Sequence, residues 1–557
     1  MSPGRLWIQV GLIFAVLYLA LLWARPMITP DEARYGAMGA DMLASGEWLK
    51  LRMCGFVYYE KPPLGTWLIA ASIGAFGHNA FAVRLPCVLA SLVSAVAAGM
   101  VARRISGRRE AAPLAAMVQL SSIFPMVIGT VAVLDPIFTA FTSLTLAWFL
   151  EGATARAAAR WRWLLAAGAA AGLAFMTKGL LAFAIPALAA GGWVLWDRRW
   201  RELPALALLP MVGAALVAGP LAWLLHRSEP DFWRYFVEVE HFRRFASPDD
   251  NQHGEPWWLL SLVLVGGGLF WSVVWTRAWG ALRGDAGMRS GVRFCVAWVA
   301  LPLALLSLSK GKLPTYVLPL FPPVSAMVAL GLLRWREQRA MSRDAGTAVA
   351  LTIVRLLAIT CLTLAVVGGD RFGIPRLWIG AEWARWLLLA TVFLAWSLLE
   401  SRAHRAHDAS AWLARMAWVP VPGLLCVHLL FPTALLSATK TPWGLLERHA
   451  SHIRDASRVI VSNSMGHPVN WASGRTDLVI VGDPSEFDNE LGIKAERTRF
   501  ITHAELQVQV QSWLASGPVV ITTGTGTIDA LAKALPDRVL ARETDRDVAI
   551  LVLSPTR

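Results

Sequence analysis

Residues 203–225 read LPALALLPMVGAALVAGPLAWLL and contain no charged side chain. A run of this length can cross the hydrocarbon core of a bilayer, which is about 30 Å thick, as one helix. Similar runs recur along most of the 557 residues, so that 56% of the chain is apolar, 16% is charged and the mean hydropathy is +0.50. Soluble domains usually carry about 25% charged residues. The composition excludes a disordered chain and a simple soluble enzyme, and it predicts a polytopic α-helical membrane protein.

The net charge of +14 reflects arginines that are gathered in groups. Successive groups are separated by enough apolar sequence for two membrane crossings, and the connections between those crossings contain little arginine. This alternation is the pattern of the positive-inside rule, so the charge reports orientation in a bacterial-type membrane and does not indicate a nucleic-acid partner. The groups lie at residues 103–109, 156–162, 198–201, 277–293, 334–343 and 402–415.

The apolar runs predict about thirteen membrane helices, beginning on the cytoplasmic side and ending outside. Residues 64–76 are apolar but too short to span, and we expect them to lie in the outer interface. Residues 1–437 would then form the membrane domain, with outer loops at 25–80 and 226–256. The expected crossings are 6–23, 81–102, 111–129, 137–151, 163–176, 179–196, 203–225, 257–276, 294–309, 317–333, 348–368, 384–399 and 418–437.

The remaining residues, 438–557, have a different pattern. Short β-branched runs at 458–462, 477–481, 518–522 and 548–553 alternate with helical patterns. Thr502 and Glu505 have the spacing of a capping box at the start of one helix. We expect a soluble, periplasmic α/β domain. Its sequence at 524–527, GTGT, follows a predicted strand, and a tight turn is favoured there over a phosphate loop because only two glycines are present.

Charged side chains are almost absent from the predicted helix interiors, where they would mark a transport pathway. They gather at outer helix ends, for example Asp135 and Lys178, and in the two outer loops. A transporter would place its substrate groups near the midplane, on broken helices of two repeated halves, and no such repeat is visible. The pattern favours an enzyme whose pocket opens to the outer leaflet, where a lipid-linked substrate can enter sideways.

The first outer loop begins with two adjacent carboxylates, Asp31 and Glu32. Thr29 can cap a helix, Pro30 suits its first position, and Glu32 would close a capping box. Capping thus explains Glu32 well and leaves Asp31 without a structural reason. We expect Asp31 to be catalytic or to position substrate, with Glu32 as the second candidate.

Lys61 follows in the same loop, before two prolines and the short interfacial helix. Free N–H groups at that helix N-terminus favour an anion beside Lys61, such as a lipid phosphate. The alternative is that Lys61 only reaches the lipid headgroups. Glu60 with His241, and in addition His253, offers ligands for a divalent ion, although an ordinary hydrogen bond is the simpler reading of a pair so distant in sequence.

A third motif, SKGKLPTY at residues 309–316, lies in an outer turn between two predicted helices. Lys310 and Lys312 flank a glycine, so their ammonium groups can follow a mobile phosphate or pyrophosphate. An outer turn with two lysines runs against the positive-inside pattern and needs a reason other than topology.

Four motifs together, DEARY at 31–35, YEKPPL at 59–64, FAVRLP at 81–86 and SKGKLPTY at 309–316, resemble the bacterial branch of the protein O-mannosyltransferase-like GT-C glycosyltransferases. Within that branch the chain is similar to the transferases that attach 4-amino-4-deoxy-L-arabinose to lipid A. The resemblance covers residues 1 to about 440, and the tail matches nothing in this way. It implies that Asp31 is the acidic residue of the first outer loop and that Lys61 lies near phosphate. The expected donor-phosphate or substrate-binding residues are Arg34, Tyr59, Lys61, Arg84, Asp135, Lys310, Lys312 and Tyr316.

The resemblance also implies the reaction. An undecaprenyl phosphate-linked sugar would be the donor, a lipid A phosphate the acceptor, and the sugar carbon would invert, which modifies lipopolysaccharide and protects against cationic peptides such as polymyxin. A glycosyl phosphate leaves as an anion while the sugar gains positive charge, so the enzyme needs cations at the phosphate and a carboxylate near the sugar. No cofactor is required by this chemistry. A related transferase acting with mannose or another sugar on protein or glycan, and a lipid flippase, are the alternatives.

Overall fold

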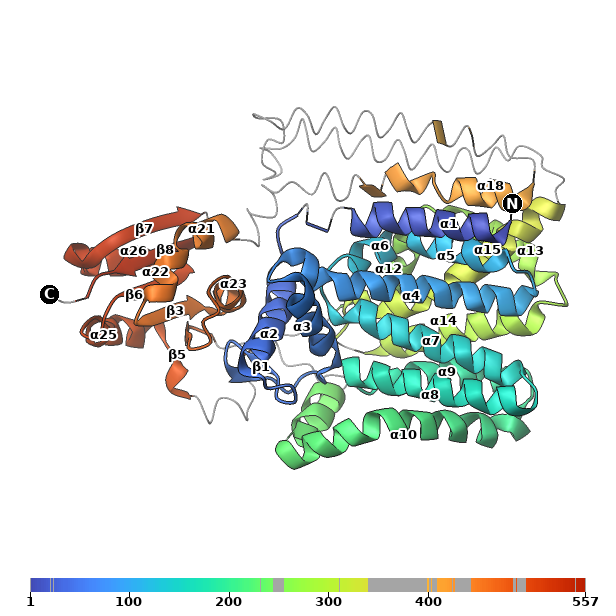
Figure 1. Ribbon diagram of the computed structural model, residues 1–557, viewed down its shortest axis with the longest axis horizontal. Helices are drawn as coiled ribbons and strands as arrows, with labels where there is room; N and C mark the ends of the chain where they lie inside the picture. Colours follow the sequence, from blue (N-terminus) through green and yellow to red (C-terminus); the bar gives the residue numbers. More distant parts are fainter. Residues whose placement is uncertain are drawn as a thin grey trace. The chain divides into compact units, whose positions relative to one another are not determined.

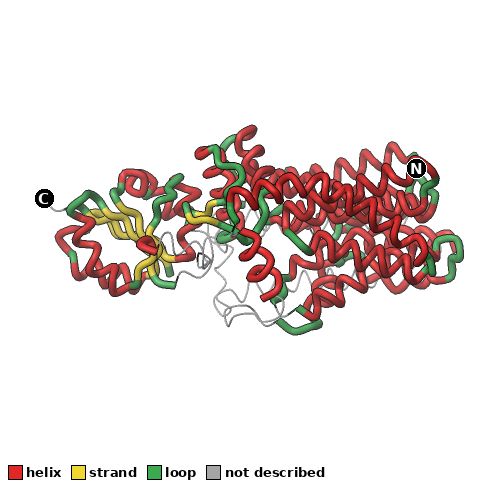
Figure 2. Tube along the Cα trace, turned by 90° about the horizontal axis from the view of Figure 1, so that it is seen from below, coloured by secondary structure: helices red, strands yellow, loops and turns green. Residues whose placement is uncertain are grey.

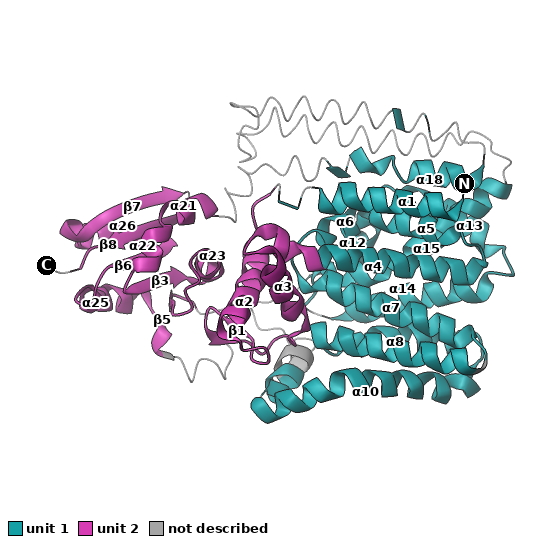
Figure 3. Cartoon of the chain, in the orientation of Figure 1, with its two compact units in different colours: residues 1–24, 87–431 teal, residues 25–86, 432–557 magenta. Residues whose placement is uncertain are grey.

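The computed structural model in Figure 1 describes residues 2–20, 22–23, 25–230, 232–243, 255–309, 311–338, 398–399, 402, 408–422, 424–425, 442–483, 487, 497–545 and 547–555. The chain divides into two compact units, which are coloured separately in Figure 3. The first, the membrane unit, comprises Met1–Ala24 and Cys87–Phe431. The second, the loop–sheet unit, combines Arg25–Pro86 with Pro432–Arg557.

The membrane unit is built of helices that run side by side (Figures 1 and 2). Prolines inside several of them are tolerated because neighbouring helices satisfy the freed backbone groups. The helices are α1 (Pro3–Phe14), η1 (Ala15–Leu19), the larger part of α4 (Ala80–Ser106), α5 (Ala111–Leu120), α6 (Ile123–Gly129), α7 (Leu134–Thr154), α8 (Ala157–Lys178), α9 (Leu181–Trp196), η2 (Trp200–Glu202), α10 (Leu203–Ser228), η3 (Arg234–Arg243), α12 (Leu259–Gly267), η4 (Ser272–Val274), α13 (Trp275–Arg283), α14 (Arg289–Leu308), η5 (Pro314–Leu320), α15 (Phe321–Gln338) and α18 (Ala409–Met416).

Four helices of the described chain are long and apolar enough to span a membrane, and six if each of two bent pairs counts as one span. The bent pairs are α5 with α6, at 69°, and η4–α13 with α12, at 93°, so the expected crossings at 111–129 and 257–276 are both broken near their middle. The expected crossings at 348–368, 384–399 and most of 418–437 lie outside the described residues. The chain is thus a helical membrane protein, and the number thirteen stays a prediction.

Glycines allow two of the membrane helices to approach at backbone distance. A Cβ atom on Gly168 of α8 would collide with the carbonyl of Pro210, and one on Gly213 of α10 would collide with the carbonyl of Leu165. Within a bilayer the hydrophobic effect does not drive helices together, because lipid is as apolar as the helix surface. Small residues at such crossings let the helices approach closely enough to be held by van der Waals contact.

The C-terminal part of the loop–sheet unit is a six-stranded sheet with the order β5-β4-β3-β6-β8-β7. Strands β5, β4, β3 and β6 are parallel to one another, β8 is antiparallel to β6, and the edge strand β7 is antiparallel to β8. Side chains from α25 and α26 fill the core on the sheet, and α23 packs against β3 and β4. The elements are α21 (Trp443–Arg448), α22 (Ala450–Asp455), β3 (Arg458–Ser462), α23 (Asn463–Ser473), β4 (Val479–Val481), η9 (Arg497–Arg499), β5 (Phe500–Ile501), α25 (His503–Leu514), β6 (Val519–Gly524), α26 (Thr525–Ala534), η10 (Pro536–Arg538), β7 (Val539–Asp545) and β8 (Val548–Leu553).

The four strands expected from β-branched runs are present as β3, β4, β6 and β8, and the capping box at Thr502 and Glu505 is formed. The sequence missed β5, which has two residues, and β7, whose burial alternates along an edge strand. At residues 524–527 strand β6 passes directly into α26, so the expected tight turn is absent from this junction.

The other part of the loop–sheet unit contains α2 (Asp31–Ser45), the hairpin β1 (Arg52–Met53) and β2 (Phe56–Val57), and α3 (Leu64–Phe76). Cys54 and Gly55 form the two-residue hairpin turn, both at positive φ, as the favoured turns of this length require. Arg499 of the sheet domain donates to the Cys54 carbonyl at 2.7 Å and lies 3.9 Å from the Phe56 ring centroid. The outer loop and the sheet domain are thereby joined in one body.

Candidate functional site

Glu32 is completely buried and accepts hydrogen bonds from two arginines. Arg84 donates to both carboxylate oxygens, at 2.8 and 2.7 Å, and Arg25 Nη1 lies 3.2 Å from Oε2. Burial alone would raise the pKa of Glu32, but Arg84, Arg25 and the N–H of Ile28 outweigh it and lower the pKa to about 2. Glu32 is therefore an ionised carboxylate held inside the protein.

This geometry corrects the expected capping box. Helix α2 begins at Asp31, with Pro30 as its N-cap residue, and no side chain caps it. Glu32 accepts the N–H of Ile28 and turns toward the guanidinium groups of Arg25 and Arg84, because a buried carboxylate is stabilised far more by two cations than by one amide.

Asp31 has the opposite environment. It is the first residue of α2, its side chain is 49% exposed, and Arg34 Nη2 lies 3.9 Å from its carboxylate. The helix dipole favours a carboxylate at this N-terminus, and the exposed side chain can contact a ligand from solvent. The structure thus separates the two adjacent acids into an internal one and an accessible one.

Lys61 lies close to Glu60 just before α3. Its ammonium donates to the Glu60 carbonyl at 3.2 Å and is 3.9 Å from Oε2 of the same residue, while Tyr58 donates to that carboxylate at 3.2 Å. The Lys61 side chain is 14% exposed and the Tyr59 residue 8%. Helix α3 begins at Leu64 with Pro63 as its N-cap, as the sequence predicted.

The metal hypothesis gains no support from the part of the chain that is described. Within it, no group of three or more His, Cys, Asp or Glu side chains is placed to hold an ion. His241 lies in η3, but its side chain is outside what the structure describes, and so is His253. Glu60 uses its carboxylate on Tyr58 and Lys61.

The membrane unit has its own polar cluster at the ends of α7 and α8. Asp135, in the first turn of α7, forms an ion pair with Lys178, the last residue of α8, and both side chains are nearly buried. The Lys178 ammonium also lies 4.9 Å from the centre of the Tyr316 ring. Sequence analysis selected Asp135 and Tyr316 but not Lys178 as site residues, although Lys178 was recognised as an outer charge.

Of the two lysines of the SKGKLPTY motif, the structure describes Lys312. Lys312 is 6% exposed and donates to the backbone carbonyl of Glu255 at 2.8 Å. It therefore connects the segment before α12 with the segment before η5 in the membrane unit. Lys310 lies outside the described residues.

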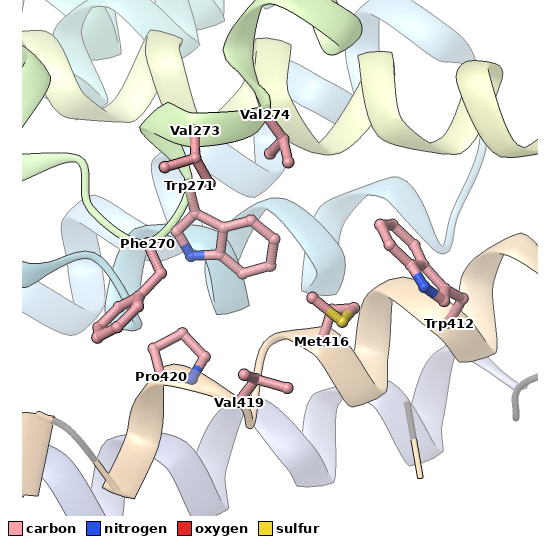
Figure 4. A pocket seen from close by; sticks show the side chains of 8 residues that line it. All are labelled: Phe270, Trp271, Val273, Val274, Trp412, Met416, Val419 and Pro420. Carbon is pink, nitrogen blue, oxygen red and sulfur yellow. The ribbon is translucent and has the colours of Figure 1, made fainter. Parts of the chain in front are cut away.

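Figure 4 shows a small cavity of the membrane unit whose lining is apolar. It has room for about one water molecule and does not suit a sugar phosphate. Its lining residues are Phe270, Trp271, Val273, Val274, Trp412, Met416, Val419 and Pro420.

A much larger cavity, of about 810 Å³, is lined by α7, α8, α9 and α10. Its walls are almost entirely Ala, Gly, Pro, Leu, Val, Met and Phe side chains, with Thr145 as the polar exception. Phe175, which lines it, precedes Lys178 by one helical turn. The cavity has the size and polarity to hold a hydrocarbon chain.

Comparison with known proteins places this fold and these residues in a class. The sequence profile described as "Dolichyl-phosphate-mannose-protein mannosyltransferase" matches residues 8–236. The crystal structure of ArnT from Cupriavidus metallidurans bound to undecaprenyl phosphate superposes with a TM-score of 0.80 over 99% of this chain and 98% of that one, at 22% identity. The apo form of the same protein gives a TM-score of 0.78. The chain is a multi-pass membrane glycosyltransferase.

Two relatives narrow the class to a family. The "undecaprenyl phosphate-alpha-4-amino-4-deoxy-L-arabinose arabinosyl transferase" of Edwardsiella ictaluri is 33% identical over 521 residues, which is 91% of each chain. Its namesake from Pseudomonas aeruginosa is 32% identical over 529 residues, 92% of this chain and 91% of that one. The chain belongs to the family of undecaprenyl phosphate-aminoarabinose arabinosyl transferases, as the sequence motifs predicted.

Proposed function

We propose that this protein transfers 4-amino-4-deoxy-L-arabinose from undecaprenyl phosphate to a phosphate of lipid A. The observation that carries the proposal is the 33% identity, across nine-tenths of both chains, to a transferase named for this donor. A relation that includes the membrane helices, the outer loops and the tail supports the same donor and sugar here.

The reaction needs no redox partner and no external base. The bond between the sugar C1 and the donor phosphate oxygen breaks, and its electron pair leaves with undecaprenyl phosphate. An oxygen of the acceptor phosphate forms the new bond to C1 from the opposite face, so the configuration inverts. Because that phosphate is already ionised, the acidic residue need only orient the acceptor or the sugar amine.

In this proposal Asp31 is the residue that orients substrate. It is the exposed member of the two adjacent acids, and Arg34 beside it adds a cation for a phosphate oxygen. Glu32 and Arg84 satisfy each other inside the protein, so we assign them to holding α2 in place. Lys61, whose ammonium contacts the Glu60 carbonyl and carboxylate, would turn toward the donor phosphate and stabilise its negative charge.

The Asp135–Lys178 pair with Tyr316 is the second proposed substrate-binding cluster. A lysine at a helix end beside one carboxylate and one aromatic ring can exchange that carboxylate for a phosphate oxygen. The large apolar cavity begins one turn from Lys178, and it supports a lipid-linked donor because a free sugar nucleotide would gain nothing from such walls.

We also propose the bacterial inner membrane as the location, with the outer loops and residues 438–557 in the periplasm. The alternating arginine groups support this orientation. Donor and acceptor would both be presented in the outer leaflet of that membrane.

The deciding experiment is mass spectrometry of lipid A from cells with and without the protein. We expect lipid A species heavier by one aminopentose only when the protein is present. A hexose gain on lipid A, or a mannosylated protein with unchanged lipid A, would instead support the alternative sugar and acceptor. Unchanged lipid A with altered distribution of lipid between leaflets would support a flippase.

A further inference from the structure

Helix α2, which carries Asp31, lies directly against α23 of the sheet domain. Gly36 of α2 has no side chain, and a Cβ atom there would be 3.0 Å from the indole of Trp471 on α23. On its other side the Trp471 ring lies 3.5 Å from the ring of His78, centre to centre. Both helices belong to the loop–sheet unit, so this packing is internal to one body.

The residue before Trp471 makes a polar contact with the same helix. Asn470 is 1% exposed, and its Nδ2 donates to Asp41 Oδ1 at 3.3 Å and to the Arg475 carbonyl at 3.0 Å. Both protons of the amide are therefore used. These two bonds fix the orientation of the amide. If its nitrogen and oxygen were exchanged, the amide oxygen would face two acceptors, Asp41 Oδ1 and the Arg475 carbonyl.

One oxygen on each of these two side chains is left over. Asp41 Oδ2 and Asn470 Oδ1 are both buried, and neither has a hydrogen-bond partner among the residues that the structure describes. Two buried acceptors on an already bonded pair are costly as they stand. One proton would serve both, because a carboxylic acid donates from its hydroxyl while its carbonyl oxygen accepts.

We propose that in mildly acidic solution Asp41 carries a proton that it donates to Asn470 Oδ1, so that an acid and an amide share two reciprocal hydrogen bonds and Asn470 becomes a positioning residue for α2. The positioning role rests on the proposed function of Asp31, whereas the protonated pair does not.

The surroundings of Asp41 agree with a neutral acid. The elements packed against α2 are α3, α23 and β1. Helix α3 has no titratable side chain, His467 of α23 lies beside Cys54 at 3.8 Å, and Arg52 of β1 is bonded to Glu47. Arg34 of α2 itself pairs with Asp31. Within the described residues no cation is at ion-pair distance from Asp41.

Burial raises the pKa of Asp41 to about 6, against the opposing effect of the Asn470 hydrogen bond. Because the pKa of Asp41 is higher in the folded protein than in the unfolded chain, where it is near 4, protonation of Asp41 stabilises the folded state. This stabilisation is complete below about pH 4 and is lost as the pH rises through about 6. Above that pH the pair keeps one hydrogen bond and a buried negative charge.

Infrared difference spectroscopy on the purified full-length protein in lipid nanodiscs tests the pair without any substrate. Asp41→Asn is the key variant, since its amide can donate where the acid donates and so keeps both hydrogen bonds at every pH. At pH 5 the wild-type protein should show a protonated-carboxyl C=O stretch that is absent from Asp41→Asn, and this band should vanish with a midpoint near pH 6. Asp529→Asn, which removes an exposed carboxylate paired with Arg542, should leave the band unchanged.

The proposed acid–amide pair would be overturned if Asp41→Asn showed the same protonated-carboxyl band. It would also be overturned if the wild-type protein showed no such band at pH 5. Thermal melting gives a second measurement. The melting temperature of the wild type should fall from pH 5 to pH 7.5 by several degrees more than that of Asp41→Asn. Equal falls would also count against the pair.

The positioning role is tested by the pH profile of sugar transfer. From pH 5 to pH 7.5 the wild-type rate, divided by the Asp41→Asn rate, should fall by at least twofold, and Asn470→Leu should be slow throughout. If the infrared band titrates but the two rate profiles coincide, the pair stands and the positioning role is overturned. If no variant and no wild-type protein transfers aminoarabinose, the proposed function fails while the infrared result keeps its meaning.

Discussion

Arg84 holds both carboxylate oxygens of Glu32, through Nε at 2.8 Å and Nη2 at 2.7 Å, and neither side chain is exposed to solvent. Arg84 also donates to the carbonyls of Arg25 and Pro26, just before α2. The first residues of α4 and the first turn of α2 are thus held together by one guanidinium. Asp31, one residue earlier, takes no part in this contact pair and has a side chain that is 49% exposed.

Glu32→Gln should destabilise the protein. Removing one partner of a buried ion pair usually costs about 3–5 kcal/mol, because the other charge remains buried. We expect a lower melting temperature of the purified protein and partial transfer activity in the molecules that stay folded. Glu47→Gln, at an exposed pair with Arg52, is the matched control and should melt near the wild type. Similar melting of the two variants would contradict the structural role of Glu32.

The pH dependence of this contribution follows from the lowered pKa. Glu32 titrates at about 2 in the folded state and near 4.5 when unfolded. Its stabilising effect is therefore complete above about pH 4.5 and is lost as the pH falls toward 2. The difference in melting temperature between wild type and Glu32→Gln should shrink over this range.

Asp31→Asn should abolish sugar transfer without harming insertion or folding. The side chain is half exposed, and ion pairs at such exposed positions add little stability, so we expect its loss to leave the fold intact. The measurement is donor consumption by purified protein, with melting temperature recorded on the same sample. Near-normal turnover by Asp31→Asn would remove this residue from the proposed role.

Lys61→Ala should lose nearly all transfer, whereas Lys61→Arg should retain some. A cation in a poorly hydrated, lipid-walled site contributes far more to a leaving phosphate than a surface lysine does. We expect at least a hundredfold loss for alanine, measured with donor in excess so that weaker binding cannot explain it; such a loss corresponds to about 2.7 kcal/mol. If Lys61→Ala consumes donor at the wild-type rate, Lys61 is only a headgroup contact.

The Asp135–Lys178 pair allows a double-variant test. Asp135→Asn or Lys178→Met alone should lower the melting temperature, because each leaves one nearly buried charge without its partner. The combined variant should recover part of that stability. It should remain inactive in transfer, since the recovery restores packing and not the charge that we assign to substrate binding. An active double variant would reduce the pair to a structural role.

The orientation predicts the position of the C-terminus. A reporter enzyme that is active only in the periplasm, fused after Arg557, should be active, and the same reporter fused after Ser106 at the end of α4 should be inactive. If intact fusion proteins instead showed reporter activity after Ser106 and none after Arg557, the loops that we place in the periplasm would lie on the cytoplasmic side. The proposed site would then be on the wrong face of the membrane.

Sequence patterns predicted features that depend on local chemistry. Apolar runs located the described membrane helices, the short apolar run at 64–76 is α3 to the residue, and β-branched runs located four strands. The bends between α5 and α6 and between α12 and η4–α13 were not predictable, since a hydropathy pattern records polarity and not direction. The edge strand β7 was missed because half of its side chains face solvent.

The candidate site, too, could be predicted only where it depends on local sequence. The preference for Asp31 over Glu32 stays a prediction, but the capping argument behind it was wrong, since Glu32 pairs with Arg84 and Arg25 and caps no helix. Arg84 lies 52 residues further along the chain, and no local pattern could have paired it with Glu32. The contacts of α2 with Asn470 and Trp471 span more than 400 positions and were hidden for the same reason.

The division of the loop–sheet unit along the chain has a consequence for biosynthesis. Residues 25–86 leave the ribosome early, and about 350 further residues must be made before Pro432 follows, which takes about 20 to 70 seconds at usual rates of translation. During that interval the outer loop lacks the helix against which Gly36 packs and the arginine that holds its hairpin. A nascent chain that terminates early would therefore insert its membrane helices yet leave this loop unfinished, exposed to proteases and unable to act before synthesis is complete.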